Sequence, residues 1–185
     1  MMRYVLNIGA LPAVTNKKDW DVYVNKGSEI GYEDVPLMMI RGNEECCYLG
    51  IKGGSPTTNH AHMDGGSFVY DAFGSAWAID PGTESYSTME KKSAELGGDF
   101  WDMSQGSARW QMAGLGNEYH STLTINDKEL NVKGKAEITE IIDKTQERGA
   151  VLDLGSLYEG ELSSAERRIS IDGTGNLAVV ARIVA

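Results

Sequence analysis

Short apolar runs of strand length recur along most of the chain, and turn-forming residues separate them. Several runs alternate apolar and polar residues, the period of a strand with one buried face. Separators such as Gly42-Asn43 and Asp172-Gly173-Thr174-Gly175 suit hairpins better than helical crossovers. The predicted strands are Val35–Arg41, Cys46–Lys52, Ser67–Phe73, Ala76–Asp80, Ser121–Asn126, Ala136–Ile142, Glu166–Asp172 and Leu177–Val184. We therefore expect an all-β fold, an antiparallel β-sandwich of two sheets.

One short helix and one long loop interrupt this pattern. Ser87-Thr88-Met89-Glu90 has the spacing of a capping box, Lys91–Leu96 contains helix formers, and Gly97-Gly98 is a natural stop. The stretch Gly97–Tyr119 has no clean period and is rich in Gly, Trp and polar residues. We expect it to be a long, ordered loop, and loops of this length are often functional.

The length of 185 residues suits one domain or two small ones. We divide it into a lead-in over residues 1–30, interpreted as the remnant of an interdomain linker, and a β-sandwich domain over residues 31–185. The apolar stretch Met1–Val14 is interrupted by Asn7, Gly9 and Pro12, so it gives no clear signal peptide.

Charge excludes one class of partner. The chain has 17 Lys and Arg against 27 Asp and Glu, for a formal net charge of −10. A surface that follows nucleic-acid phosphates needs the opposite sign, so we expect no nucleic-acid partner. No apolar run reaches the length of a membrane span.

The strongest local motif is His60-Ala61-His62, followed by Asp64. On a strand, residues i and i+2 share a face, so these side chains are expected to project together. Imidazole and carboxylate groups are zinc ligands. A further carboxylate, Asp80, and the third histidine, His120, each adjoin the end of a predicted strand. This pattern favours a metal site over an isolated polar pair.

Two metal-binding architectures fit this pattern less well. A metallo-β-lactamase-like centre needs more histidines than this chain has, and Gly65 stands where another is required. A cupin shows a glycine six residues before His-x-His, as Gly54 and His60 do, but it also needs a glutamate shortly afterwards, where residues 65–68 read Gly-Gly-Ser-Phe. The cupin-like metalloenzyme remains an alternative.

A family resemblance covers the chain from about Gly31 to about Ala136, and weakly to the end. The block Asn59–Phe68 (NHAHMDGGSF), then Ala78–Gly82 (AIDPG) with Tyr86 beyond, and later His120–Asn126 (HSTLTIN) resemble the C-terminal β-domain of heparinase II/III-like polysaccharide lyases, which include oligoalginate lyases. Many members read His-Asn-Thr-Leu where this chain has His120-Ser121-Thr122-Leu123. The ligand histidine is therefore kept while the amide is lost.

The resemblance implies a role for each motif residue. It implies one zinc ion, which we interpret as structural, held by His62, Asp80 and His120, and it implies that His60 faces the substrate as a catalytic residue. Asp64 is then expected to orient an imidazole or to form a turn. Beyond the resemblance, Arg109 can pair with a sugar carboxylate, and Trp110 and Tyr86 can contact a sugar ring.

The resemblance also implies a function, β-elimination on an acidic, uronic-acid-containing polysaccharide or oligosaccharide such as alginate or a glycosaminoglycan. The family's α/α-toroid domain, which carries the catalytic tyrosine and the carboxylate clamp, is absent from this chain. We therefore expect the isolated chain to be inactive, and the family implies a periplasmic or secreted location. The rival hypothesis is a carbohydrate-binding or structural β-domain that performs no chemistry.

Overall fold

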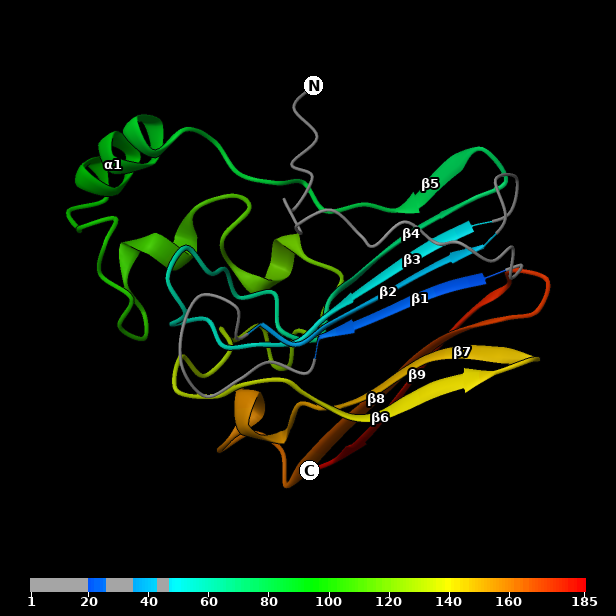
Figure 1. Cartoon of the computed structure of the whole chain (residues 1–185). Coiled ribbons are helices and arrows are strands. Elements are labelled where there is room, and N and C mark those ends of the chain that lie inside the picture. Colours follow the sequence, from blue (N-terminus) through cyan, green and yellow to red (C-terminus); the bar gives the residue numbers. More distant parts are fainter. Residues whose placement is uncertain (1–19, 26–34, 43–46) are drawn as a thin grey trace.

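The computed structural model describes residues 20–25, 35–42 and 47–185. Two antiparallel sheets lie face to face (Figure 1). The first contains β1 (Trp20–Asn25), β2 (Leu37–Gly42), β3 (Cys47–Lys52), β4 (Phe68–Ala72) and β5 (Ser75–Ala78) in that order. The second contains β6 (Glu137–Lys144), β7 (Glu147–Asp153), β8 (Ser164–Asp172) and β9 (Leu177–Val184). The predicted antiparallel sandwich is confirmed.

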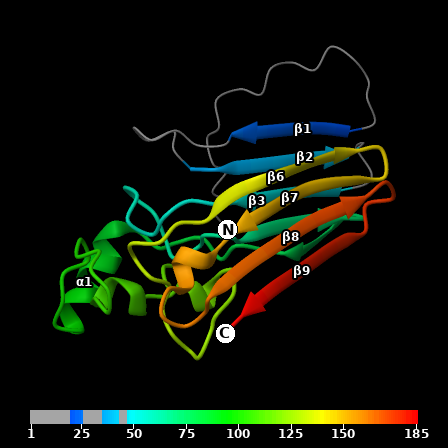
Figure 2. The ribbon, with the colours of Figure 1, turned by 90° about the horizontal axis from the view of Figure 1, so that it is seen from below.

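Each sheet follows chain order, so neighbouring strands are neighbours in sequence (Figure 2). The predicted turn at residues 172–175 joins β8 to β9, with Ile171 opposite Leu177. No strand pairs across the two sheets among the described residues, so these strands form no closed barrel. The cupin-like alternative, which needs a barrel, gains no support from this topology.

The core lies between the two inner faces. Alternate residues of β2 and β3, such as Met38, Ile40 and Leu49, are fully buried, and so are Leu152 and Ile169 of the opposite sheet. This alternation is the period that the sequence shows in these runs. Burial of both inner faces explains why two sheets form from strands of only moderate hydrophobicity.

The helix α1 (Tyr86–Glu95) begins earlier than the predicted capping box. Ser85 is the N-cap, and its side chain accepts a hydrogen bond from the Thr88 backbone N–H. The predicted stop is correct, because Gly97 adopts the left-handed conformation that ends helices. The following loop contains two short 3-10 helices, η1 (Ala108–Gln111) and η2 (Asn117–Tyr119).

Three parts of the predicted strand pattern need correction. Ser121–Asn126 is not a strand, and Asn126 has a positive φ of 53° that ends any extended run. The strands β1 and β7 were not predicted, and β7 contains Arg148 and Gly149 among its apolar residues. The first strand lies inside the predicted lead-in, so the sheet begins before residue 31.

The long connections gather at one end of the sandwich (Figure 1). The loop between β3 and β4 spans residues 53–67, and the segment between β5 and β6 spans residues 79–136. An isolated bridge between Gly54 and Ala136 joins them. Every candidate residue of the sequence motifs therefore lies at this end. Among the described residues, no helix combines the length and apolar character needed to cross a bilayer.

Candidate metal site

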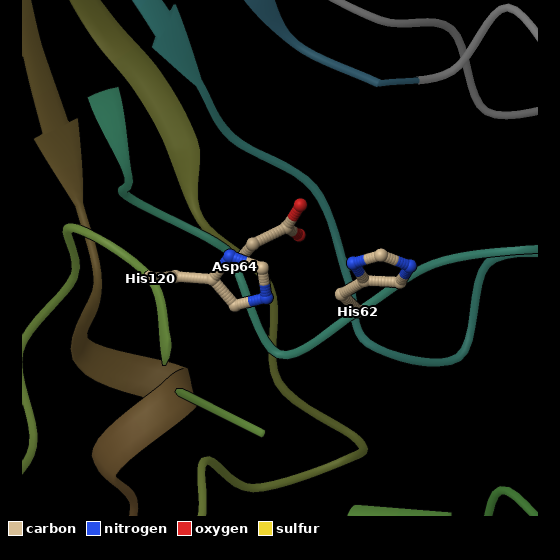
Figure 3. A group of neighbouring side chains, drawn as sticks. All are labelled: His62, Asp64 and His120. Atoms are coloured by element: carbon tan, nitrogen blue, oxygen red, sulfur yellow. The ribbon is translucent and has the colours of Figure 1, made fainter. Parts of the chain in front are cut away.

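The side chains of His62, Asp64 and His120 meet at the end of the sandwich. One potential ligand atom from each lies within 4.8 Å of the others. Figure 3 shows them turned toward one another, with His62 and Asp64 on one loop and His120 on a second. Residues nearly sixty positions apart are thus brought together. The family resemblance implied that His62 and His120 share a site, with Asp80 and not Asp64 as the carboxylate.

A buried arginine and a hydroxyl hold the two loops in place. Arg167 of β8 donates from Nη1 to the carbonyl oxygen of Gly66 at 2.9 Å and to that of Ser121 at 2.6 Å. The Thr122 hydroxyl donates to the Gly65 carbonyl oxygen at 2.6 Å. These bonds join the residues that follow His62 and Asp64 to the residues that follow His120.

A glycine is required where the first loop passes over the second sheet. Gly66 has a φ of +80°, and a Cβ there would lie 2.7 Å from Leu154 Cδ2. Any side chain would be strained in this backbone conformation and would push the loop away from the core. The Gly65-Gly66 pair is therefore a packing requirement of the site.

His120 is the most enclosed member of the group. Its side chain has no exposed surface, and its Nδ1 lies 2.7 Å from Asp80 Oδ2. Since a carboxylate accepts, Nδ1 donates, and a neutral ring then carries its lone pair on Nε2. Among the described residues, no group hydrogen-bonds to this buried Nε2. A buried acceptor without a donor is costly, and a metal ion would satisfy it.

His62 is uncharged at neutral pH. Its pKa is lowered to about 4, chiefly by burial, with nearby His120 and Lys52 acting in the same direction and Asp64 and Asp80 opposing the shift. A neutral imidazole has a lone pair available, so His62 needs to lose no proton to bind a metal. The ring centroids of His62 and His120 lie 5.5 Å apart.

The two carboxylates differ in their partners. Asp64 forms an ion pair with Lys52 of β3 and is 9% exposed. Asp80 contacts His120 and accepts a 2.8 Å hydrogen bond from the Gly82 N–H. Burial would raise the pKa of Asp80, but the hydrogen bonds from His120 and Gly82 outweigh it and lower the pKa. Asp80 therefore remains ionised beside His120.

His60 is not a member of this group. The motif lies on a loop and not on a strand, and His60 has a φ of 62°, so the expectation that His60 and His62 share a face is wrong. The His60 Nδ1 lies 2.6 Å from the hydroxyl of Tyr86, and the two rings are nearly parallel. Both side chains are exposed, and they form a separate polar pair beside the metal-site group.

Two residues expected at the substrate lie inside the protein. Arg109 is 2% exposed and donates to the carbonyl oxygens of Phe100 and Ala61, at 3.1 Å and 2.9 Å. Trp110 is 3% exposed, and its indole N–H donates to the Ser104 carbonyl oxygen. Neither side chain offers a surface to a sugar in this arrangement, because both are buried.

The donor set fits a metal ion such as zinc. Two imidazoles and a carboxylate converge, one imidazole is neutral, and the other has an unsatisfied buried nitrogen. These are ligands that zinc accepts in tetrahedral sites. The chemistry of this group, rather than the sequence motif alone, supports metal binding.

The supporting residues could not be found from the motif. Lys52 and Arg167 lie on strands, where the sequence gives no sign that they contact the site loops. Lys52 ends an apolar run and Arg167 lies in an alternating one, and both positions usually carry solvated charges.

Comparison with known families gives one match. The family described as heparinase II/III-like, C-terminal, matches residues 25–173, which include β2 to β8 and the whole candidate site. No curated protein matches the chain. The chain therefore belongs to the heparinase II/III-like C-terminal family and is a β-domain related to polysaccharide lyases.

Proposed function

We propose that this chain is the metal-bearing β-domain of a lyase that cleaves uronic-acid-containing glycans by β-elimination. The observation that carries the proposal is the pairing of His60 with Tyr86 at 2.6 Å, on the same loop that supplies His62 and Asp64 to the group with His120. His60 and Tyr86 thus form an exposed pair that can transfer a proton, and the group of His62, Asp64 and His120 can hold the loop that carries His60. Membership of the family supports the same class of substrate.

The reaction explains what the exposed pair does. A β-elimination removes the proton on C5 of the uronate and expels the substituent on O4. It needs a base near C5, an acid near O4 and a group that neutralises the carboxylate. His60 and Tyr86 share one hydrogen bond, so either ring can take or give a proton at that position. The remaining groups belong to an α/α-toroid domain, which is the proposed partner of this chain.

We further propose that one zinc ion is held by His62, Asp80 and His120. Asp80 is ionised and already contacts His120, whereas the charge of Asp64 is balanced by Lys52. Bound zinc would fix the loop of residues 53–67 to the loop after β5, and so fix His60 at the cleft. Its role is structural.

A specific observation favours a second arrangement, in which Asp64 is the carboxylate ligand. Asp64 lies in the group with both imidazoles, while the free nitrogen of His120 is Nε2 and Asp80 sits behind Nδ1. Asp80 would then orient the imidazole, a common arrangement at zinc sites. Two variants separate the arrangements, because loss of a ligand removes zinc whereas loss of an orienting carboxylate weakens binding by about 10–100-fold.

The zinc content of the purified chain tests the proposal. We expect one zinc per chain, no zinc in His62→Ala, and no zinc in Asp80→Asn, with Asp64→Asn retaining it. Zinc that is retained in Asp80→Asn and lost in Asp64→Asn would establish the second arrangement. A chain that is metal-free and takes up no added zinc would refute the metal site.

The place of action follows from the substrate class. Acidic polysaccharides lie outside the cytoplasm, so we propose a periplasmic or secreted location.

A carbohydrate-binding domain without chemistry would retain zinc and glycan affinity, but turnover in the full enzyme would then not depend on His60.

A further inference from the structure

We propose that Trp101, held edge-to-face by Tyr86, provides an aromatic platform that stacks against a pyranose ring of the glycan, one ring away from the unit at His60. The inference rests on the proposed function and adds a subsite to it. The residues come from α1 and from the loop that follows it.

The platform exposes ring carbon and not polar atoms. Tyr86 is 45% exposed and Trp101 is 47% exposed. The Tyr86 hydroxyl contacts His60, and the Trp101 indole N–H donates to Glu90 Oε1 at 3.0 Å. Both polar ends therefore have partners, and the accessible part of each side chain is an apolar ring surface. Such a surface suits the C–H face of a sugar.

The rings are fixed before any ligand arrives. The Tyr86 and Trp101 centroids lie 5.5 Å apart in an edge-to-face arrangement. Phe100, which is 2% exposed, packs edge-to-face against Trp101 at 4.8 Å and anchors it to the core. A side chain already held in one orientation loses little conformational entropy on binding, so its stacking contributes to affinity.

Position links the platform to the reacting unit. Tyr86 contacts both His60 and Trp101, so these three side chains form a chain of contacting rings, here called the row. A glycan bound at His60 would extend along this row, which places its next sugar over Trp101.

Charge indicates which part of the sugar is recognised. The residue beside the Trp101 indole is Glu90, an acid, which would repel a uronate carboxylate. The platform is therefore suited to the face of the ring and not to its charge. Because salt screens this repulsion, added salt should not weaken binding there.

The chain offers a matched control in Trp77. This residue is 68% exposed, and its indole N–H also has a partner, the Ala72 carbonyl oxygen, but it lies on β5 outside the row. Trp101→Ala should weaken binding of short alginate or chondroitin oligosaccharides by about threefold to tenfold, and Trp77→Ala should leave it unchanged. Equal affinities in the two variants would overturn the platform.

A measurement on the unaltered sequence guards against a variant that misfolds. The chain has four tryptophans, and incorporation of 5-fluorotryptophan gives each a fluorine resonance. Trp101→Phe assigns the relevant one. Oligosaccharide should shift the Trp101 resonance and not the Trp77 resonance, also in about 1 M salt, where the Debye length is about 3 Å. No shift at Trp101 with any of these oligosaccharides contradicts the inference.

Failure of the platform and failure of the proposed function give different results. A chain that binds zinc and oligosaccharide, loses oligosaccharide in His60→Ala and keeps it in Trp101→Ala would refute the platform alone. A chain that takes up no zinc but shows the Trp101 shift would refute the metal site and leave the platform standing.

Discussion

Arg109 donates a hydrogen bond to the carbonyl oxygen of Ala61, the residue between the two motif histidines, at a distance of 2.9 Å. Its guanidinium also lies 4.7 Å from the centre of the Phe100 ring. One buried side chain thus connects the histidine loop to the residue that supports Trp101. Arg109 is a positioning residue for both, although the sequence suggested a direct contact with substrate.

Replacing Arg109 should therefore weaken the fold and the site together. In Arg109→Met the carbonyl oxygens of Ala61 and Phe100 lose their donor, so we expect the free energy of unfolding to fall by about 2–3 kcal/mol. Arg109→Lys should recover little, because an ammonium lacks the fork that reaches both carbonyls. Urea unfolding measures the loss, and Arg182→Met is the control, since Arg182 is exposed in its contact with Glu166. Equal stability of the two methionine variants would contradict the positioning role.

Removal of metal should lower the stability of the chain. An ion that binds only the folded state adds about 2.7 kcal/mol when its free concentration is a hundredfold above its Kd. For a domain of this size a chelator should then lower the Tm by roughly 5–10 °C. The His62→Ala variant supplies the control, since a chelator should leave its Tm unchanged. If the unaltered chain responds no more than this variant, the metal is not structural.

The two motif histidines should separate in function. In an enzyme that joins this β-domain to its toroid, His60→Ala should abolish turnover and retain zinc, because His60 contacts Tyr86 and is not a member of the group of His62, Asp64 and His120. His62→Ala should lose the zinc. Turnover assays and elemental analysis of the same preparations decide the matter. Loss of zinc with full turnover in His60→Ala would reverse the two roles.

Much of the fold follows from local pattern. Alternating runs such as Glu166–Asp172 form strands because one face has a sheet to pack against, and Gly97 ends α1 as its sequence position predicts. Ser121–Asn126 shows the same alternation but lies in the site loops and pairs with no strand. Its backbone is instead held by contacts from Arg167 and Tyr158. Tertiary contacts override the period there.

The site is predictable only in part because motif spacing identifies residue types and not their surroundings. The approach of His62 to His120 was expected from the motif. The positive φ of His60, which sends its ring to Tyr86, depends on the whole loop. Burial of the Arg109 side chain depends on how the whole segment of residues 97–119, to which it belongs, packs against the histidine loop, and no short sequence pattern encodes that packing.

Acid should weaken the second sheet through Glu147. Arg168 binds both oxygens of this carboxylate, at 2.8 and 2.7 Å, and the Ser170 hydroxyl donates to it at 2.8 Å. Hydrogen bonds from Arg168 and Ser170 lower the pKa of Glu147. A lowered pKa means that the pair stabilises the fold above the ordinary glutamate pKa and that this contribution is lost as the pH falls through the folded-state value.

The Glu147→Gln variant should therefore be less stable than the unaltered chain at pH 7, and this difference should shrink as the pH falls below about 4. The side chains are each about one-third exposed, so the effect should be below about 1 kcal/mol. Urea unfolding over this pH range measures the difference in the free energy of unfolding. Glu166→Gln is the matched control, because Glu166 pairs with the exposed Arg182. A Glu147→Gln difference that stays constant with pH would contradict the role of the carboxylate.

The chain by itself should release no unsaturated uronate from alginate, heparan or chondroitin fragments. In the proposed function, the described residues supply one proton-transferring pair, His60 and Tyr86, and the buried Arg109 cannot serve as a clamp for the uronate carboxylate. Enzymes that lose a catalytic unit commonly retain a rate only about 10³–10⁴-fold above that in water. Because half of the cleft is also proposed to lie on the toroid, we expect the rate of the isolated chain to be too low to detect. Near-ultraviolet absorbance of the unsaturated product detects even slow turnover. If the isolated chain turns over at an enzymatic rate and Tyr86→Phe abolishes that rate, then Tyr86 is the catalytic acid or base and the toroid is dispensable for the chemistry.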